Sequence, residues 1–256
     1  MLLAMDVGNT HTVLGLFSGS DLVRRWRVRT VRDGTADEYG VVIRDLCRDE
    51  AGRKRHVDGM VIATVIPPLQ SVLSEMGGNY FGLSPVFVTA ENLPGIKVLY
   101  RQPSDVGADR VVNAVAALEE HAPPLIIVDF GTAITFDVIN ERGEYLGGSI
   151  VPGIGISLQA LYQSASRLRP VDLILPPSPV GSNTEESIRS GVLFGYGSLV
   201  EGMVQRIAEK LEKKPTVITT GGFAPLMTPV LRDIDLVDTD LTLKGLAIAY
   251  ERLTQG

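Results

Sequence analysis

The 256-residue sequence predicts an α/β protein built from two similar lobes. The main observation is a pattern that occurs twice, in residues 2–17 and again in residues 125–140. Each copy is an apolar run ending in aspartate, then x-Gly, then small hydroxyl or amide residues and a second apolar run. Helix and strand patterns follow both copies, which is typical of an α/β organisation. Alanine and two prolines at 122–124 interrupt the chain between the copies, so we expect lobes at 1–118 and 119–256.

The first lobe opens with an apolar pattern that predicts an antiparallel meander of three strands. Thr35 is the expected N-cap of a helix that runs to about Arg48, because apolar residues recur there at helical spacing. The expected elements are strands at 2–7, 11–17 and 22–29, a helix at 35–48, a strand at 57–65, a helix from about 67, a strand at 85–89 and a helix at 107–121.

The second lobe repeats this order, starting with a second meander over 125–150. A proline-rich stretch at 167–182 predicts irregular chain, and a long helix is expected from Thr184 to about Lys214. Its glycines Gly191 and Gly195 form a notch that would allow close approach of a second helix. The other expected elements are a helix from about 152 to 166, a strand at 217–221, a short helix, a strand at 234–237 and a closing helix at 241–253.

The two copies place a carboxylate at each strand–turn–strand. Superposing them makes four pairs equivalent: Asp6 with Asp129, Gly8 with Gly131, Asn9 with Thr132 and Thr12 with Thr135. Two such lobes facing each other across a cleft would suit a nucleoside triphosphate and its metal. A glycine allows close approach of backbone amides to phosphate, and Asp6 beside phosphates implies Mg²⁺ held through water. One loop alone is equally typical of an ordinary hairpin, and the second copy is what favours the phosphate interpretation.

Composition excludes several classes of function. The net charge of −6 argues against nucleic acid as the main partner, since phosphate-backbone binding needs concentrated Lys and Arg. The basic run at 24–29 alternates with apolar residues and predicts the solvated face of a strand, with Trp26 packed on a helix. Cys47 is the single cysteine, so an intrachain disulfide is impossible, and burial in the core is expected. No apolar run reaches the length of a membrane span, so we expect a cytoplasmic protein.

Two further segments contain residues that could bind a nucleotide or act in catalysis. Gly221-Gly222 follows a predicted strand, where an open α/β sheet can place adenine or ribose. Residues 107–110 read Gly-Ala-Asp-Arg at a helix start, where an acid is also typical of an ordinary first turn. In a kinase, Asp109 could accept the proton of an attacking hydroxyl, and Arg110 could bind a substrate carboxylate. The sequence has no Walker motif and no dinucleotide fingerprint after its first strand.

These motifs together resemble the type III pantothenate kinases, within the acetate kinase/sugar kinase/Hsp70/actin superfamily. The resemblance rests on Asp6-Val-Gly-Asn-Thr, Gly107-Ala-Asp-Arg, Asp129-Phe-Gly-Thr-Ala, the run from Gly147 to Ile154 and the run from Gly181 to Gly191. They occur in the same order from residue 2 to about 252. The resemblance implies a duplicated ribonuclease H-like, actin-like ATPase fold with two lobes and a cleft. It also implies ATP-dependent phosphorylation of pantothenate to 4′-phosphopantothenate, the first step of coenzyme A biosynthesis, by a homodimer that uses Mg²⁺ and K⁺ or NH₄⁺.

The resemblance also implies residue roles. Asp109 would be the general base, Asp129 would bind the monovalent cation and Asp6 would hold Mg²⁺ through water. The residues expected to bind ATP are Asp6, Val7, Gly8, Asn9, Thr10, His11, Thr12, Val13 and Thr132. Those expected to bind pantothenate are Tyr100, Gly107, Ala108, Asp109, Arg110 and Thr184, the last as the N-cap of the long helix. His11 is a departure, because the family pattern has asparagine there, and a neutral imidazole can also donate to phosphate.

Three alternatives stay open at this point. The first is a kinase of another small hydroxylated acceptor, since phosphate loops establish phosphoryl chemistry better than acceptor identity. The second is a non-catalytic ATP-binding regulator or an actin-like assembly protein, which would not need the 107–110 segment. The third is a transcriptional accessory factor with this fold, which the acidic charge disfavours.

Overall fold

The computed structural model describes residues 1–53 and 55–255, which group into two compact units. The first unit contains Met1–Glu119 together with the C-terminal segment from Asp240, and the second is Glu120–Thr239. We expected all of 119–256 in the second lobe. The segment from Asp240 instead joins the first unit, because its helix packs against β1, β2 and β4 there.

The first unit is built on a sheet with strand order β3-β2-β1-β4-β5. Neighbours β1, β2 and β3 are antiparallel, and β4 and β5 continue the sheet parallel to β1. The strands are β1 (Leu2–Val7), β2 (His11–Ser18), β3 (Asp21–Arg29), β4 (Gly59–Thr64) and β5 (Val86–Phe87). The other elements are α1 (Ala36–Leu46), α2 (Leu69–Phe81), β6 (Lys97–Val98), η1 (Pro103–Asp105), α3 (Ala108–Glu120) and α7 (Leu241–Thr254).

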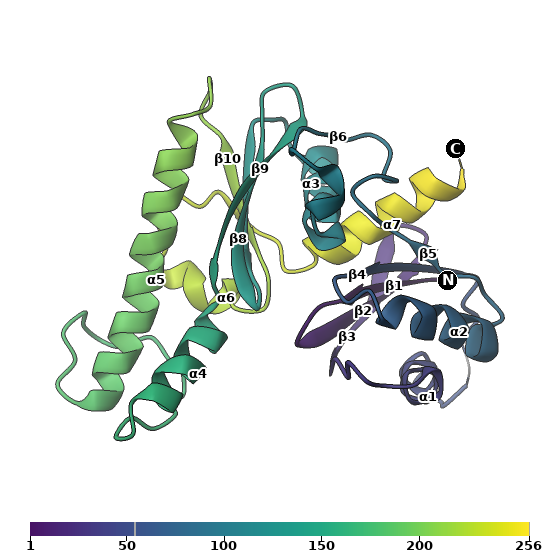
Figure 1. Cartoon of the computed structure of the whole chain (residues 1–256), viewed down its shortest axis with the longest axis horizontal. Coiled ribbons are helices and arrows are strands. Elements are labelled where there is room, and N and C mark those ends of the chain that lie inside the picture. Colours follow the sequence, from purple (N-terminus) through teal and green to yellow (C-terminus); the bar gives the residue numbers. More distant parts are fainter. Residues whose placement is uncertain (54, 256) are drawn as a thin grey trace. The chain divides into compact units, whose positions relative to one another are not determined.

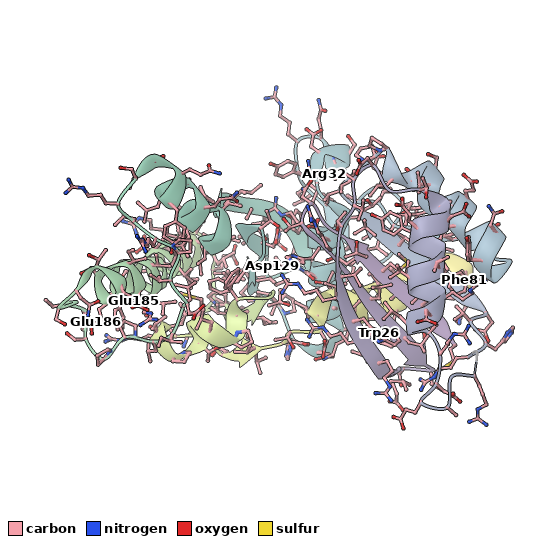
Figure 2. The ribbon with its side chains drawn as sticks, turned by 90° about the horizontal axis from the view of Figure 1, so that it is seen from below. Trp26, Arg32, Phe81, Asp129, Glu185 and Glu186 are labelled. Carbon is pink, nitrogen blue, oxygen red and sulfur yellow. The ribbon has the colours of Figure 1, made fainter. Side chains whose placement is uncertain are left out.

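Helices cover both faces of this sheet (Figure 1). Alternate strand residues such as Leu3, Met5 and Leu14 are fully buried in one apolar cluster with residues of α1 and α2. Trp26 packs against the same cluster, as predicted (Figure 2). The opposite face carries α7, which packs closely at Gly59, because a Cβ there would lie 2.5 Å from the Tyr250 hydroxyl oxygen.

Helix α1 begins where the sequence predicts. The Thr35 hydroxyl accepts from the Glu38 amide at 3.2 Å, and the Thr35 amide donates to the Glu38 carboxylate at 2.8 Å. This reciprocal pair satisfies two amides at the helix start. Cys47, just past the helix, is buried as expected, and desolvation raises the pKa of its thiol to about 11.

The second unit repeats the architecture of the first. Its strands lie in the order β11-β10-β7-β8-β9, with β7, β8 and β9 antiparallel and β10 and β11 parallel to β7. This is the arrangement of the first sheet, so the predicted duplication is confirmed. The strands are β7 (Leu125–Phe130), β8 (Ala133–Ile139), β9 (Glu144–Pro152), β10 (Thr216–Thr220) and β11 (Leu236–Val237). The helices are α4 (Ile154–Ser164), α5 (Thr184–Ala208), α6 (Ala224–Met227) and η2 (Thr228–Val230).

Helix α5 begins at Thr184, as predicted, but its N-cap and its C-terminal end differ from the prediction. Its N-cap is Asn183, whose side chain accepts from the Glu186 amide at 2.9 Å, so Thr184 is the first helical residue. Glu185 and Glu186 follow in the first turn, where the helix dipole favours acids (Figure 2). The helix ends at Ala208, short of the predicted Lys214, since the following residues connect it to β10.

Candidate active site

The first phosphate loop is the tight turn between β1 and β2. The Gly8 amide donates to the His11 carbonyl at 3.1 Å, which leaves Asn9 and Thr10 as the two exposed residues of the turn. Asp6 lies opposite Val13 across the hairpin and is partly exposed. Strand alternation places Asp6 and Val13 on the sheet face that α7 covers.

Thr12 lies on the other face of the hairpin. Its side chain is fully buried, and its hydroxyl oxygen is 2.9 Å from that of Thr30. The Thr30 amide also donates to the Thr10 carbonyl at 3.1 Å. Thr12 therefore braces the loop against the residue that follows β3, and its hydroxyl is turned towards the core.

Two arginines contact the side chains of this loop. Arg27 of β3 approaches the His11 ring with 2.9 Å between a guanidinium nitrogen and Nδ1. Arg32 donates to the Asn9 Oδ1 at 2.9 Å and to the Asn9 carbonyl at 3.4 Å. Burial, and then the Arg27 charge, lower the pKa of His11, so the ring is neutral near pH 7. Sequence reasoning missed both arginines, although alternation of basic and apolar residues along 24–29 placed Arg27 on a solvated strand face.

The second loop, between β7 and β8, is one residue shorter than the first. The Gly131 amide donates to the Ala133 carbonyl at 3.0 Å, so Thr132 alone forms the tip, and it is exposed. As a result Asp129 lies opposite Thr135, whereas Asp6 lies opposite Val13. The predicted equivalence of Thr12 and Thr135 is therefore wrong, because a one-residue change in a hairpin moves side chains to the other face.

Asp129 lies against the turn after β10. Gly221 has φ of 93°, and a Cβ there would lie 2.3 Å from Asp129 Oδ1 and 2.6 Å from the Phe130 amide nitrogen. Thr220 lies beside Asp129 in the parallel pairing of β10 with β7. Glycine is thus required at 221 both for its backbone conformation and for the space that the Asp129 carboxylate occupies.

Asp109 lies in the first turn of α3, close to Gly107. A Cβ on Gly107 would be 2.3 Å from Asp109 Oδ1, and the Arg110 amide donates to the same oxygen at 3.0 Å. Burial is the main influence on the carboxyl and raises its pKa, while the Arg110 amide and guanidinium act in the opposite direction. A buried carboxylate with a raised pKa is a good proton acceptor near neutral pH.

The predicted substrate residues are divided between the two units. Ala108 and Arg110 are buried beside Asp109 in the first unit, and Tyr100 is 37% exposed on the loop that precedes η1. Thr184 is in the second unit, on the wall of a pocket of about 450 Å³. This pocket is lined by Arg167, Arg169, Pro170, Val171, Asp172, Thr184, Glu185 and Ile188.

Comparison with known proteins defines the family. A family model for type III pantothenate kinase matches residues 2–206. The chain belongs to the type III pantothenate kinase family. A relative from Anaeromyxobacter sp. (strain K), named type III pantothenate kinase, is 51% identical over 252 residues, which cover 98% of this chain and 99% of the relative. The expected membership of this family is therefore confirmed.

Solved structures with low sequence identity share the fold. The activator of the 2-hydroxyisocaproyl-CoA dehydratase from Clostridium difficile, solved with ADPNP bound, superposes with a TM-score of 0.58 at 13% identity and covers 99% of this chain. An inorganic polyphosphate/ATP-glucomannokinase from Arthrobacter sp. strain KM gives a TM-score of 0.55 at 14% identity and covers 100% of it. Because ATPases and sugar kinases share these mixed sheets, the predicted α/β fold of the actin-like ATPase type is confirmed.

The family implies ATP with a divalent metal, and the donors in this chain suit a metal held mainly by phosphate and water. Among residues 1–53 and 55–255, no three His, Cys, Asp or Glu side chains cluster as a metal site. Asp6 and Asp129 lie near the ends of β1 and β7, and each contributes one carboxylate beside the turn that follows its strand. None of the helices in the described part of the chain is long and apolar enough to span a bilayer.

Proposed function

We propose that this protein transfers the γ-phosphoryl group of ATP to the primary hydroxyl of pantothenate, giving 4′-phosphopantothenate for coenzyme A biosynthesis. The observation that carries the proposal is the match along nearly the whole chain to a relative named for this activity. The half-buried Asp109 carboxylate beside Gly107 supplies the group that a hydroxyl acceptor requires.

In this proposal Asp109 accepts the proton of the pantothenate hydroxyl as that oxygen attacks phosphorus. A positioned base of this kind contributes about 10²–10⁴-fold to the rate. Arg110 has only hydrogen-bond donors, which suits the pantothenate carboxylate. Tyr100, Gly107, Ala108 and Thr184 complete the set that we assign to this substrate.

The segment from Asp6 to Val13, with Thr132, binds ATP in this proposal, and Asp6 holds Mg²⁺ through water. Thr12 contributes by bracing the segment through its contact with Thr30. When bound, the metal neutralises charge on the phosphoryl group during transfer. Backbone and side-chain donors of the first loop orient the phosphates, and positioning provides most of the rate enhancement. Asp129 binds K⁺ or NH₄⁺, and Gly221 leaves the space that its carboxylate needs.

We also propose a cytoplasmic homodimer formed through α5. Gly191 and Gly195 both face open space, since no atom lies within 4 Å of a Cβ built on either. Leu199 on the same helix is 36% exposed. These small residues would let a second helix approach closely. Sedimentation velocity should give a dimer for the wild type and a monomer for Gly195→Glu, and a wild-type monomer at micromolar concentration would refute the dimer.

The proposed function is tested by ATP consumption with Mg²⁺, with and without pantothenate, in K⁺ and then in Na⁺ buffer. Turnover that requires pantothenate and falls in Na⁺ would support the acceptor and the Asp129 assignment together. Glucose in place of pantothenate is the control for a sugar kinase of the same fold. Turnover with glucose but not with pantothenate would contradict the proposal.

A further inference from the structure

Donors of the protein itself occupy the backbone carbonyls of residues 9–11 and the side-chain acceptors of Asn9 and His11. Residues 9–11 carry five acceptor atoms besides the Thr10 hydroxyl: three backbone carbonyls, Asn9 Oδ1 and His11 Nδ1. The Asn9 carbonyl and Oδ1 receive donors from Arg32, the Thr10 carbonyl from the Thr30 amide and the His11 carbonyl from the Gly8 amide. Arg27 contacts His11 Nδ1. Every one of these acceptors therefore faces a donor of the protein itself.

The Arg27 contact fixes the tautomer of His11. A guanidinium has five N–H donors and no acceptor, so a 2.9 Å contact with Nδ1 requires a lone pair on that nitrogen. The neutral ring must then carry its proton on Nε2, where it is a donor. The lowered pKa of His11, caused by burial and then by the Arg27 charge, agrees with a neutral ring.

The Arg32 contact fixes the orientation of the Asn9 amide in the same way. The donor-only guanidinium at 2.9 Å must face the carbonyl oxygen Oδ1. The Asn9 side chain therefore presents its NH₂ group, with two donors, on the other side. At Asn9 and His11, therefore, an arginine occupies the side-chain acceptor, and the side chain presents its donors on the other side.

We propose that Arg27 and Arg32 are positioning residues that set the polarity of the loop at 9–11, so that it presents donors to phosphate oxygens. This inference rests on the proposed function, which places ATP phosphates at this loop. It gives the departure at His11 a physical role: a neutral imidazole held by Arg27 offers one N–H, as an asparagine amide would. Each arginine acts through a loop side chain and need not contact ATP.

The direct test is the ring ¹⁵N spectrum of His11 in the nucleotide-free full-length protein. The inference predicts the Nε2–H tautomer in the wild type and a mixture of both tautomers in Arg27→Met. Arg24→Met is the matched control, because it removes one positive charge from the same strand. Arg24 pairs with Glu50 and not with the loop. Its spectrum should match the wild type, and an Nδ1–H tautomer in the wild type would overturn the inference.

The functional test compares binding of inorganic tripolyphosphate and the KM for ATP. Arg27→Met and Arg32→Met should each weaken binding by about tenfold, as expected for one charge-assisted hydrogen bond, and raise KM more than they lower kcat. In the double variant Arg27→Met with His11→Gln the two losses of tripolyphosphate binding should not add, because Arg27 acts through the side chain at position 11.

The two proposals fail differently. If Arg27→Met and Arg32→Met bind tripolyphosphate as tightly as Arg24→Met does, the polarity inference is overturned even where pantothenate is phosphorylated. If the wild type shows the Nε2–H tautomer and the predicted loss of binding but no pantothenate turnover, the inference stands and the proposed function is wrong.

Discussion

Substituting Gly221 by alanine tests whether the turn after β10 holds Asp129 in place. The alanine would adopt φ of 93°, which costs an L-residue about 1–2 kcal/mol of folding free energy. Its Cβ would lie 2.3 Å from Asp129 Oδ1, where ordinary contact begins at 3.4 Å, so the carboxylate must move by about 1 Å. A displacement of that size at a reacting site can cost about 100-fold in rate. We therefore expect kcat/KM to fall by about 100-fold, with weaker activation by K⁺.

Gly19→Ala is the matched control for this experiment. Gly19 has φ of 61°, and no atom lies within 4 Å of a Cβ built there, so the variant has backbone strain without a steric clash. Urea unfolding should show a loss of about 1–2 kcal/mol for Gly19→Ala and a larger loss for Gly221→Ala. Steady-state kinetics across K⁺ concentrations should show lost activity in Gly221→Ala alone. Equal activity in the two variants would refute the reasoning that links Gly221 to Asp129.

Three further predictions concern Asp109, its neighbouring glycine and the α1 cap. Asp109→Asn should lower kcat by about 10²–10⁴-fold in a coupled ATP assay and raise the urea midpoint at pH 7. The expected gain in stability of Asp109→Asn follows because burial raises the Asp109 pKa. The folded chain binds the Asp109 proton more tightly than the unfolded chain does, and the stability that this difference gives the wild type is lost as pH rises through the folded pKa. For the same reason the wild-type kcat should fall as pH decreases through the raised pKa, and a pH profile that is unchanged in Asp109→Asn would contradict this. Gly107→Ala should rotate the Asp109 carboxylate and lower kcat with little change in thermal midpoint, since the clash is with a side-chain end. Thr35→Ala should cost about 1 kcal/mol in urea unfolding with kinetics unchanged, and no loss would show that the capping box is unimportant.

Local patterns predicted most of the fold. The two hairpins, their Asp-x-Gly turns and the Thr35 cap depend on residues close in sequence, and each lies where the pattern placed it. The C-terminal helix was found but assigned to the wrong unit. Its periodicity shows an apolar face without showing which sheet that face covers, and it packs on β1 and β4.

The errors at the candidate site have specific structural causes. The second turn is closed by Thr132 alone, so Thr135 faces Asp129 where the alignment had matched it to Thr12. The two copies align residue for residue in the sequence, so the pattern does not reveal that the second turn is one residue shorter. The contacts of Arg27 and Arg32 depend on the register of β3 against β2 and on side-chain direction, which the sequence leaves open.

The most direct test of the central claim is phosphorus NMR of the products formed from ATP and pantothenate by the purified protein. We predict ADP and one new phosphate monoester signal that requires pantothenate, with both greatly reduced in Asp109→Asn while its fold is retained by circular dichroism. ADP accompanied by inorganic phosphate alone, or an undiminished monoester signal in Asp109→Asn, would contradict the account.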